Sequence, residues 1–155
     1  MAAPIGLPVK RREDRRPLTG RGRFVDDMRL PDLVHAAIVR SPHAHARVLA
    51  VQARRARALP GVGAVLTIAD LPECVAAVPP LVASPRFRAY AQPAIAGPKV
   101  RHAGEAVTVV VADDAYGAAD AADAVVVEYA VLPAAATVEA GLLRRASTHP
   151  GHSRV

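Results

Sequence analysis

Three histidines stand close together in the sequence and could offer imidazole nitrogens to a metal ion: His35, His43 and His45. A catalytic zinc site takes three protein ligands in a fixed geometry. No Cys or Glu lies near these histidines in the sequence to complete such a set. We therefore predict no metal site here, and we expect His43 and His45 to lie at a subunit or domain interface.

Three other features also lack the partners that their chemistry needs. Gly20-Arg21-Gly22 has too few glycines for a dinucleotide-binding loop, which also needs a strand before it and a helix after it. Glu105 follows Gly104 before a predicted strand, where we expect a buried carboxylate without a second acid, base or nucleophile. Cys74 stands in a proline-flanked loop and is expected to be a free thiol. The sequence thus predicts no catalytic, cofactor-binding or metal-binding residue on this chain.

The composition predicts one small domain with a core of small side chains. The chain has 155 residues, about the size of one domain, with 52% hydrophobic residues but only 3% aromatic residues and no Trp. One cysteine cannot form an internal disulfide or hold an iron–sulfur cluster alone. No apolar run approaches the roughly 20 residues that cross a bilayer, so we predict a cytoplasmic protein with no membrane partner.

The net charge of +6 is unevenly distributed along the chain. Residues 1–57 carry 13 basic and 5 acidic side chains, whereas residues 58–143 carry 4 basic and 9 acidic ones. Arginine, which pairs well with carboxylates and phosphates, accounts for 18 of the 20 basic residues. Single-stranded nucleic acid binding also needs stacking aromatics, and only Phe24 lies in the first 57 residues. We therefore do not expect nucleic acid to be the main partner.

The hydrophobic pattern predicts an extended arm followed by two strand–helix–strand units. The arm, residues 1–33, is rich in charge, Gly and Pro and has one short turn. The first unit has strands at 33–40 and 47–51, a helix at 53–59 that Pro60-Gly61 ends, and a strand at 62–68. Residues 72–99 are rich in proline and predict a long loop at an interface.

The second unit consists of a strand at 106–112, a helix at 115–124 and a strand at 125–131. Asp113-Asp114 can cap this helix, and its apolar face is predicted to contain Ala115, Ala118, Ala119, Ala122 and Val126. The pattern predicts a mixed α/β (α+β) fold, with one domain over residues 34–140 and an unstructured tail over residues 141–155.

Three segments, in this order and spacing, resemble one protein family. They comprise residues 12–14, 18–27 and 30–31; residues 33–36, 39–47, 59–62, 64–67 and 69–72; and residues 100–107, 127–129 and 132–133. Together they resemble the large subunits of the xanthine dehydrogenase, aldehyde oxidase and carbon monoxide dehydrogenase family of molybdenum hydroxylases. The resemblance runs from about residue 8 to about residue 140, although His102-Ala103-Gly104-Glu105-Ala106-Val107 stands where the family has Tyr-Val-Gly-Glu-Pro-Val.

The resemblance implies an α/β-hammerhead domain at the start of a longer chain, whose later domains hold the molybdenum-pterin and the catalytic glutamate. It also implies two-iron two-sulfur clusters and FAD on partner subunits or domains, and no cofactor on this chain. The complete enzyme would oxidise aldehydes, N-heterocycles or CO. Residues expected at interfaces, or supporting the molybdenum domains, are Arg23, Phe24, Asp26, Asp27, Arg40, His43, His45, Gly104 and Glu105.

The resemblance stops after about Gly141, where an arginine-bearing tail begins. We therefore expect a reading-frame slip or an early stop in a large-subunit gene, and a structural fragment that is inactive alone. A second hypothesis stays open, in which the chain is a free-standing basic module that binds protein or nucleic acid.

Overall fold

The computed structural model describes residues 5, 6, 8, 10–73, 77, 78, 81, 82, 84 and 91–142. The predictions for Cys74 and for residues 143–155 fall outside the described residues. The chain divides into two compact units, residues 1–33 and 34–155.

The first unit contains two single turns of helix, where the sequence predicted one short turn. They are α1, Arg15–Leu18, and the 3-10 helix η1, Val25–Asp27. The Thr19 hydroxyl donates to the carbonyl of Arg15 at 2.6 Å, which satisfies an acceptor at the end of α1. The Asp27 carboxylate accepts the Phe24 N–H at 2.9 Å and closes η1. Neither turn has a buried residue, so local hydrogen bonds rather than a core hold this unit.

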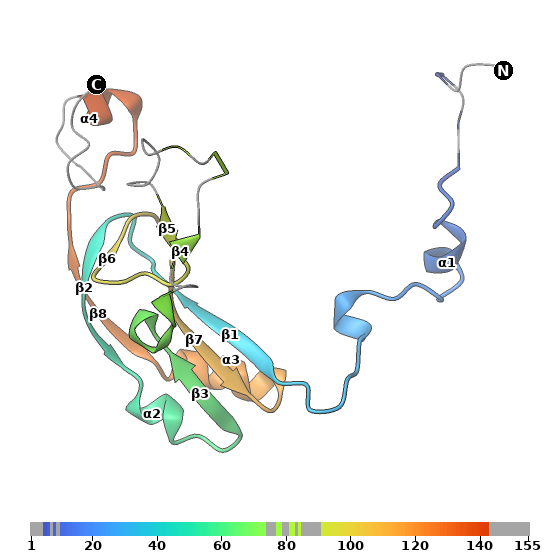
Figure 1. Ribbon diagram of the computed structural model, residues 1–155, viewed down its shortest axis with the longest axis horizontal. Helices are drawn as coiled ribbons and strands as arrows, with labels where there is room; N and C mark the ends of the chain where they lie inside the picture. The colour runs from blue at the N-terminus through green and yellow to red at the C-terminus, as the bar shows by residue number, and fades with distance from the viewer. Residues whose placement is uncertain are drawn as a thin grey trace. The chain divides into compact units, whose positions relative to one another are not determined.

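The second unit is built on two three-stranded antiparallel sheets (Figure 1). The first sheet has the order β1-β7-β3, with β1 at His35–Arg40, β7 at Ala106–Ala112 and β3 at Val62–Leu66. The second has the order β6-β2-β8, with β6 at Lys99–Val100, β2 at Ala46–Gln52 and β8 at Val126–Val131. The mixed α/β class predicted from the sequence is confirmed.

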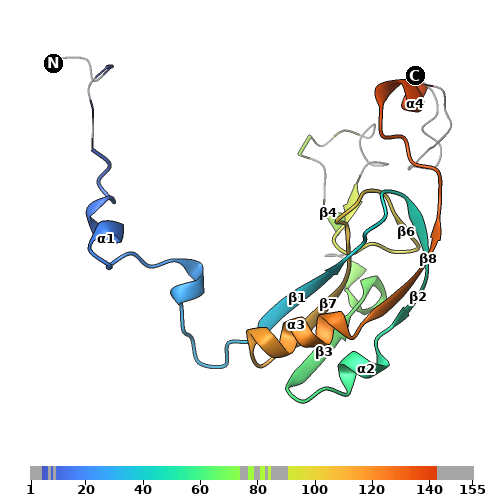
Figure 2. The same cartoon turned by 180° about the vertical axis from the view of Figure 1, so that it is seen from behind.

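Each strand–helix–strand unit links the two sheets. The first runs from β2 through α2, Arg54–Arg57, to β3, and the second runs from β7 through α3, Ala115–Asp123, to β8. The α3 helix lies behind the β1-β7-β3 sheet in Figure 1 and in front of it in Figure 2. The strands that flank each helix are therefore not neighbours in one sheet, which the local pattern of apolar residues could not show.

Several predicted boundaries were wrong, for identifiable local reasons. The first strand begins at His35 rather than residue 33, because a turn precedes it in which Asp32 has a φ of 58°. The strand predicted at 62–68 ends at Leu66, and the 3-10 helix η2, Ile68–Asp70, follows. There the Asp70 carboxylate accepts both the N–H and the hydroxyl of Thr67, at 2.7 and 2.8 Å.

The segment predicted as a long loop also contains regular structure. The strands β4, Ala77–Val78, and β5, Gln92–Pro93, pair with each other. Strand β6 begins at Lys99, the last residue of the predicted loop. The α4 helix, Val138–Leu142, extends two residues into the predicted unstructured tail. The helix predicted at 53–59 is a single turn, at Arg54–Arg57.

The apolar face predicted for α3 was right for Ala118, which is buried, and for Ala122, which packs against the core, but it was wrong for the other three residues. Ala118, Ala121 and the following Val125 are buried, whereas the predicted Ala115, Ala119 and Val126 are exposed. The Asp114 carboxylate caps the helix by accepting the N–H groups of Tyr116 and Gly117, both at 2.9 Å. Because alanines occur on every side of this helix, hydrophobicity alone does not distinguish its buried face.

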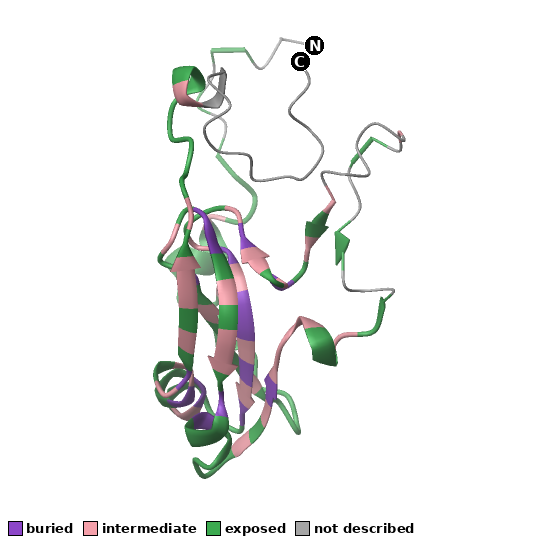
Figure 3. Ribbon diagram, turned by 90° about the vertical axis from the view of Figure 1, so that its left-hand side faces the viewer, coloured by how far each residue is buried: buried purple, intermediate pink, exposed green. Residues whose placement is uncertain are grey.

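The core consists of small side chains, as the composition predicted. One buried cluster joins α2, α3 and the first sheet: Ala53, Ala56, Val65, Val110, Ala121 and Val125. A second buried cluster joins β2, β6 and β7 to the loop before β6: Ala46, Ala96, Val100 and Val107. In Figure 3 the buried positions follow the strands and the sides of the helices that face them. Such a core depends on close packing, because each side chain buries little area.

Two neighbouring valines on β7 differ in how far they are buried, and this difference tests where the core lies. Val110 is fully buried, whereas Val109 points to the opposite face of the sheet and is only half-buried. We expect Val110→Ala to lower the free energy of unfolding by about 2 kcal/mol through lost burial and a residual cavity. The matched Val109→Ala has the same change in strand propensity and should cost less than half as much in urea unfolding. Equal losses would contradict the assignment of Val110, but not Val109, to the buried core.

Candidate functional site

The candidate site lies where the chain crosses between the two sheets at residues 41–45. Ser41, which is only 2% exposed, follows β1, and His45, which is 5% exposed, precedes β2. The Ser41 hydroxyl accepts the N–H of His43 at 3.1 Å, which forms a tight turn around Pro42. We call residues 41–45 the first crossing.

A second crossing, residues 101–105, joins β6 to β7 and meets the first. The Ser41 N–H donates to the Glu105 carbonyl at 2.9 Å, and the Gly104 N–H donates to the Ser41 carbonyl at 2.8 Å. The Arg40 guanidinium donates to the Gly104 carbonyl at 2.8 Å. Gly104 has a φ of +86°, a conformation that favours glycine. The structure thus brings Arg40 together with Gly104 and Glu105, which lie in a different segment of the sequence.

Glu105 is the buried carboxylate that the sequence led us to expect, with 7% of the residue exposed. One carboxylate oxygen accepts the Arg101 N–H at 2.5 Å. The carboxylate also lies 3.7 Å from the guanidinium of Arg101 and 3.7 Å from Nδ1 of His102. Its oxygens are therefore directed at its own turn, which is the arrangement of an anchor rather than of a general base that faces a substrate.

His45 fixes the end of β8 from inside the domain. Its Nδ1 lies 2.6 Å from the carbonyl of Pro133, and its own carbonyl accepts the Leu132 N–H at 2.9 Å. A carbonyl can only accept, so Nδ1 carries the proton and Nε2 holds a lone pair in the neutral ring. Nε2 is buried and has no hydrogen-bond partner among the described residues.

His43 lies half-buried against Tyr129 of β8. The two rings meet edge to face, with centroids 4.9 Å apart and planes inclined by 73°. Burial raises the pKa of the Tyr129 phenol above its ordinary value of 10.0, and a hydrogen bond with the Ser41 side chain partly offsets this rise. His43 and His45 thus make different contacts, His43 with Tyr129 and His45 with Pro133.

The other predicted interface residues belong to the first unit. Arg23 and Phe24 line one hollow there, and Phe24 is 69% exposed. Asp27 caps η1, and the carbonyl of Asp26 accepts a hydrogen bond from Arg29 at 2.9 Å. These residues form a surface of their own within the arm.

Sequence reasoning missed several residues that build the site. Ser41, Arg101, Tyr129 and Pro133 were quoted as parts of the family segments but were not chosen as site residues. Their partners lie as far as 88 residues away in the chain, as for His45 and Pro133. The four-residue spacing of Arg101 and Glu105 was a local signal that could have indicated an ion pair.

Neither a metal centre nor a membrane helix is found in the part of the chain that the structure describes. No three His, Cys, Asp or Glu side chains gather there in a group that could hold a metal ion. None of the described helices is long and apolar enough to cross a membrane.

The geometry defines a class of domain: two antiparallel sheets linked by paired crossings and two helical connections, with buried polar groups bonded to their own turns. A sequence model of the family described as "Aldehyde oxidase and xanthine dehydrogenase, a/b hammerhead domain" matches residues 19–133. The chain belongs to this family.

Relatives with known names agree with this assignment. The chain is 43% identical over 129 residues to the carbon monoxide dehydrogenase large chain of Afipia carboxidovorans, which covers 83% of the chain and 15% of the relative. It is 37% identical to the putative xanthine dehydrogenase molybdenum-binding subunit of Escherichia coli K12, covering 84% of the chain and 18% of the relative. The chain therefore spans less than a fifth of the length of these relatives.

A solved structure shows the same fold at similar identity. Quinoline 2-oxidoreductase from Pseudomonas putida 86 superposes with a TM-score of 0.82 and 42% sequence identity. The match covers 90% of this chain and 18% of the quinoline 2-oxidoreductase chain. The hammerhead fold predicted from the family resemblance is thereby confirmed.

The anchoring role of Glu105 can be tested by removing its charge. Glu105→Gln keeps the size of the side chain but removes the ion pair with Arg101, so we expect a loss on the order of 1–2 kcal/mol in urea unfolding. The control is Asp120→Asn, on the exposed side of α3. A Glu105→Gln chain as stable as the wild type would show that the carboxylate does not hold the second crossing.

The raised pKa of Tyr129 predicts an alkaline loss of stability. The unfolded phenol ionises near pH 10, whereas the folded phenol ionises at higher pH, so stability falls as pH rises from the first value through the second. We expect Tyr129→Phe to reduce this loss, measured by urea unfolding at several alkaline pH values. Tyr116→Phe, at a residue that is 85% exposed, should leave the loss unchanged. Identical pH profiles for Tyr129→Phe and the wild type would overturn this assignment.

Proposed function

We propose that this chain is a structural hammerhead module of a molybdenum-dependent hydroxylase or dehydrogenase large subunit and is not catalytic by itself. The observation that carries the proposal is the family match over residues 19–133, in a chain that spans 15% and 18% of two such large-subunit relatives. In this proposal the molybdenum-pterin belongs to other domains or subunits, and iron–sulfur and FAD subunits are further partners in the cytoplasm.

The site supports a structural role because its polar groups are bonded to the domain's own backbone. Arg40 donates to the Gly104 carbonyl, and the Glu105 carboxylate accepts the Arg101 N–H. His45 contacts the Pro133 carbonyl through Nδ1. A nucleophile, base or acid needs to face a reacting group, whereas these groups hold two crossings together. The site is therefore suited to present a rigid end of the domain to a neighbouring domain.

The metal content of a complex purified from native cells tests this proposal. A tagged copy of the full chain, expressed in its native host, is expected to co-purify with molybdenum and iron at near-stoichiometric levels and with flavin absorbance. The purified chain without those partners should not oxidise aldehydes, N-heterocycles or CO.

A chain that emerges alone and free of metal would overturn the proposal. An untagged host lysate passed over the same resin controls for adventitious metal. Activity of the isolated chain with any of these substrates would overturn the non-catalytic part.

The alternative is a free-standing basic module, and one observation favours it: Arg12, Arg15, Arg16, Arg21 and Arg23 of the arm have no ion-pair partner within the described part of the chain. Salt-sensitive binding of the isolated chain to nucleic acid would support that alternative.

A further inference from the structure

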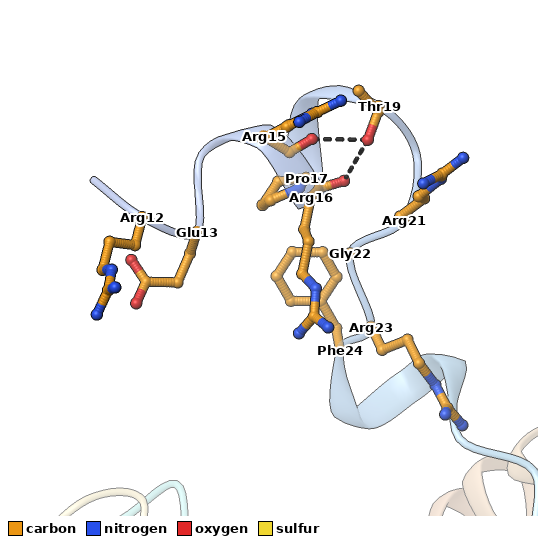
Figure 4. A pocket seen from close by; sticks show the side chains of 10 residues that line it. All are labelled: Arg12, Glu13, Arg15, Arg16, Pro17, Thr19, Arg21, Gly22, Arg23 and Phe24. Atoms are coloured by element: carbon orange, nitrogen blue, oxygen red, sulfur yellow. Dashed lines mark hydrogen bonds between the residues drawn. The ribbon is translucent and has the colours of Figure 1, made fainter. Parts of the chain in front are cut away.

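Five arginines of the first unit surround one open hollow beside the ring of Phe24 (Figure 4). They come from both sides of the α1 turn: Arg12, Arg15, Arg16, Arg21 and Arg23. We call this group the arginine hollow. Residues 10–23 carry seven basic and two acidic side chains, so positive charge is concentrated around it.

The backbone around the arginine hollow is held in a defined reversal. The Arg21 N–H donates to the Arg16 carbonyl at 2.8 Å, and the Thr19 hydroxyl donates to the Arg15 carbonyl at 2.6 Å. Gly20 makes the reversal possible with a φ of +69°. A Cβ at Gly22 would lie 3.2 Å from Pro17 and 3.6 Å from the Phe24 ring, so the chain at Gly22 has returned close to Pro17 in α1.

Within the described part of the chain, no acidic side chain compensates the charges in the arginine hollow. Among the described residues, none of the five guanidinium groups forms an ion pair or a hydrogen bond with protein. Glu13 lines the same hollow without making an ion pair. Gathering like charges is unfavourable, and an anionic partner would relieve this repulsion.

The surroundings of the arginine hollow favour a polypeptide over nucleic acid. Leu18, Phe24 and Val25 are 84%, 69% and 83% exposed beside the arginines. Arginine together with exposed aromatic and aliphatic side chains is typical of protein interface centres. Nucleic acid would need more stacking rings and a wider basic surface, yet residues 34–140 carry nine basic and nine acidic side chains.

We propose that the arginine hollow binds an acidic segment of a partner polypeptide. The segment's carboxylates pair with the fork-shaped guanidinium groups, while its apolar side chains cover Phe24 and Leu18. This inference rests on the proposed function in one respect, because it names the chemistry of the surface on which the module docks.

The test uses the full chain and a fluorescein-labelled peptide of alternating glutamate and leucine residues, with binding followed by fluorescence anisotropy. Arg15→Glu/Arg16→Glu reverses two charges in the hollow and should weaken binding about tenfold or more. The matched control is Arg54→Glu/Arg55→Glu, because both pairs are exposed and open a four-residue helix. The control should bind within about twofold of the wild type. Equal losses in the two variants, or none in the first, would overturn the proposal.

Two further measurements separate the polypeptide from other anions. Phe24→Ala keeps every charge and should still weaken peptide binding about threefold to fivefold, which corresponds to roughly 0.6–1 kcal/mol. Single-stranded DNA of equal charge should bind more weakly than the peptide at physiological salt. Unchanged peptide binding by Phe24→Ala, or tighter binding of the DNA, would overturn the assignment of a polypeptide partner.

The peptide assay and the metal assay can fail independently. A wild-type chain that co-purifies with molybdenum but does not bind the acidic peptide would overturn this inference alone. A wild-type chain that binds the peptide but carries no molybdenum-containing partner would overturn the proposed function alone. The unfolding curve of each variant shows whether its hammerhead unit is intact.

Discussion

The pairing of the two crossings is the contact on which the arrangement of both sheets depends. Strands β1 and β2 are consecutive in the chain but lie in different sheets, and so do β6 and β7. These two crossings are joined through Ser41, which bonds to Gly104 and to Glu105. Because the N–H and the carbonyl of Ser41 are both used, a shift of either crossing by one residue would break its hydrogen bonds to the other crossing. The Glu105 carboxylate and the Arg40 guanidinium then satisfy backbone groups that these changes of direction leave without a strand partner.

The small side chains of the core make that register more important. Valine and alanine cannot fill gaps by changing conformation as methionine can, so the packing of β7 against α3 requires a close and fixed approach. Both helical connections cross from one sheet to the other, and they cover the same face of the β1-β7-β3 sheet with alanines. The paired crossings at one end and the alanine-lined helices on that face therefore hold the two sheets in place.

The sequence predicted much of this fold because its strands are short valine-rich runs between prolines and glycines. The runs at 106–112 and 125–131 correspond closely to β7 and β8, and the family segments predicted the hammerhead fold. The start of α3 after Asp114 was predicted, but its buried face was predicted only in part, because alanine has no strong preference for either side. The antiparallel arrangement was also hidden, since a strand–helix–strand pattern does not say whether its two strands share a sheet.

The candidate site shows the same limit. Glu105 was recognised as a buried carboxylate from one short segment, whereas the contact of His45 with Pro133 spans 88 residues and leaves no local trace. Charge divides the chain differently: basic and acidic side chains balance over residues 34–140, where charged groups such as Glu105 and Arg40 bond internally. The excess of basic side chains at residues 10–23 forms no ion pairs among the described residues. Charged groups therefore hold the turns of the second unit, whereas the arginine hollow of the first unit is open to the acidic partner segment proposed above.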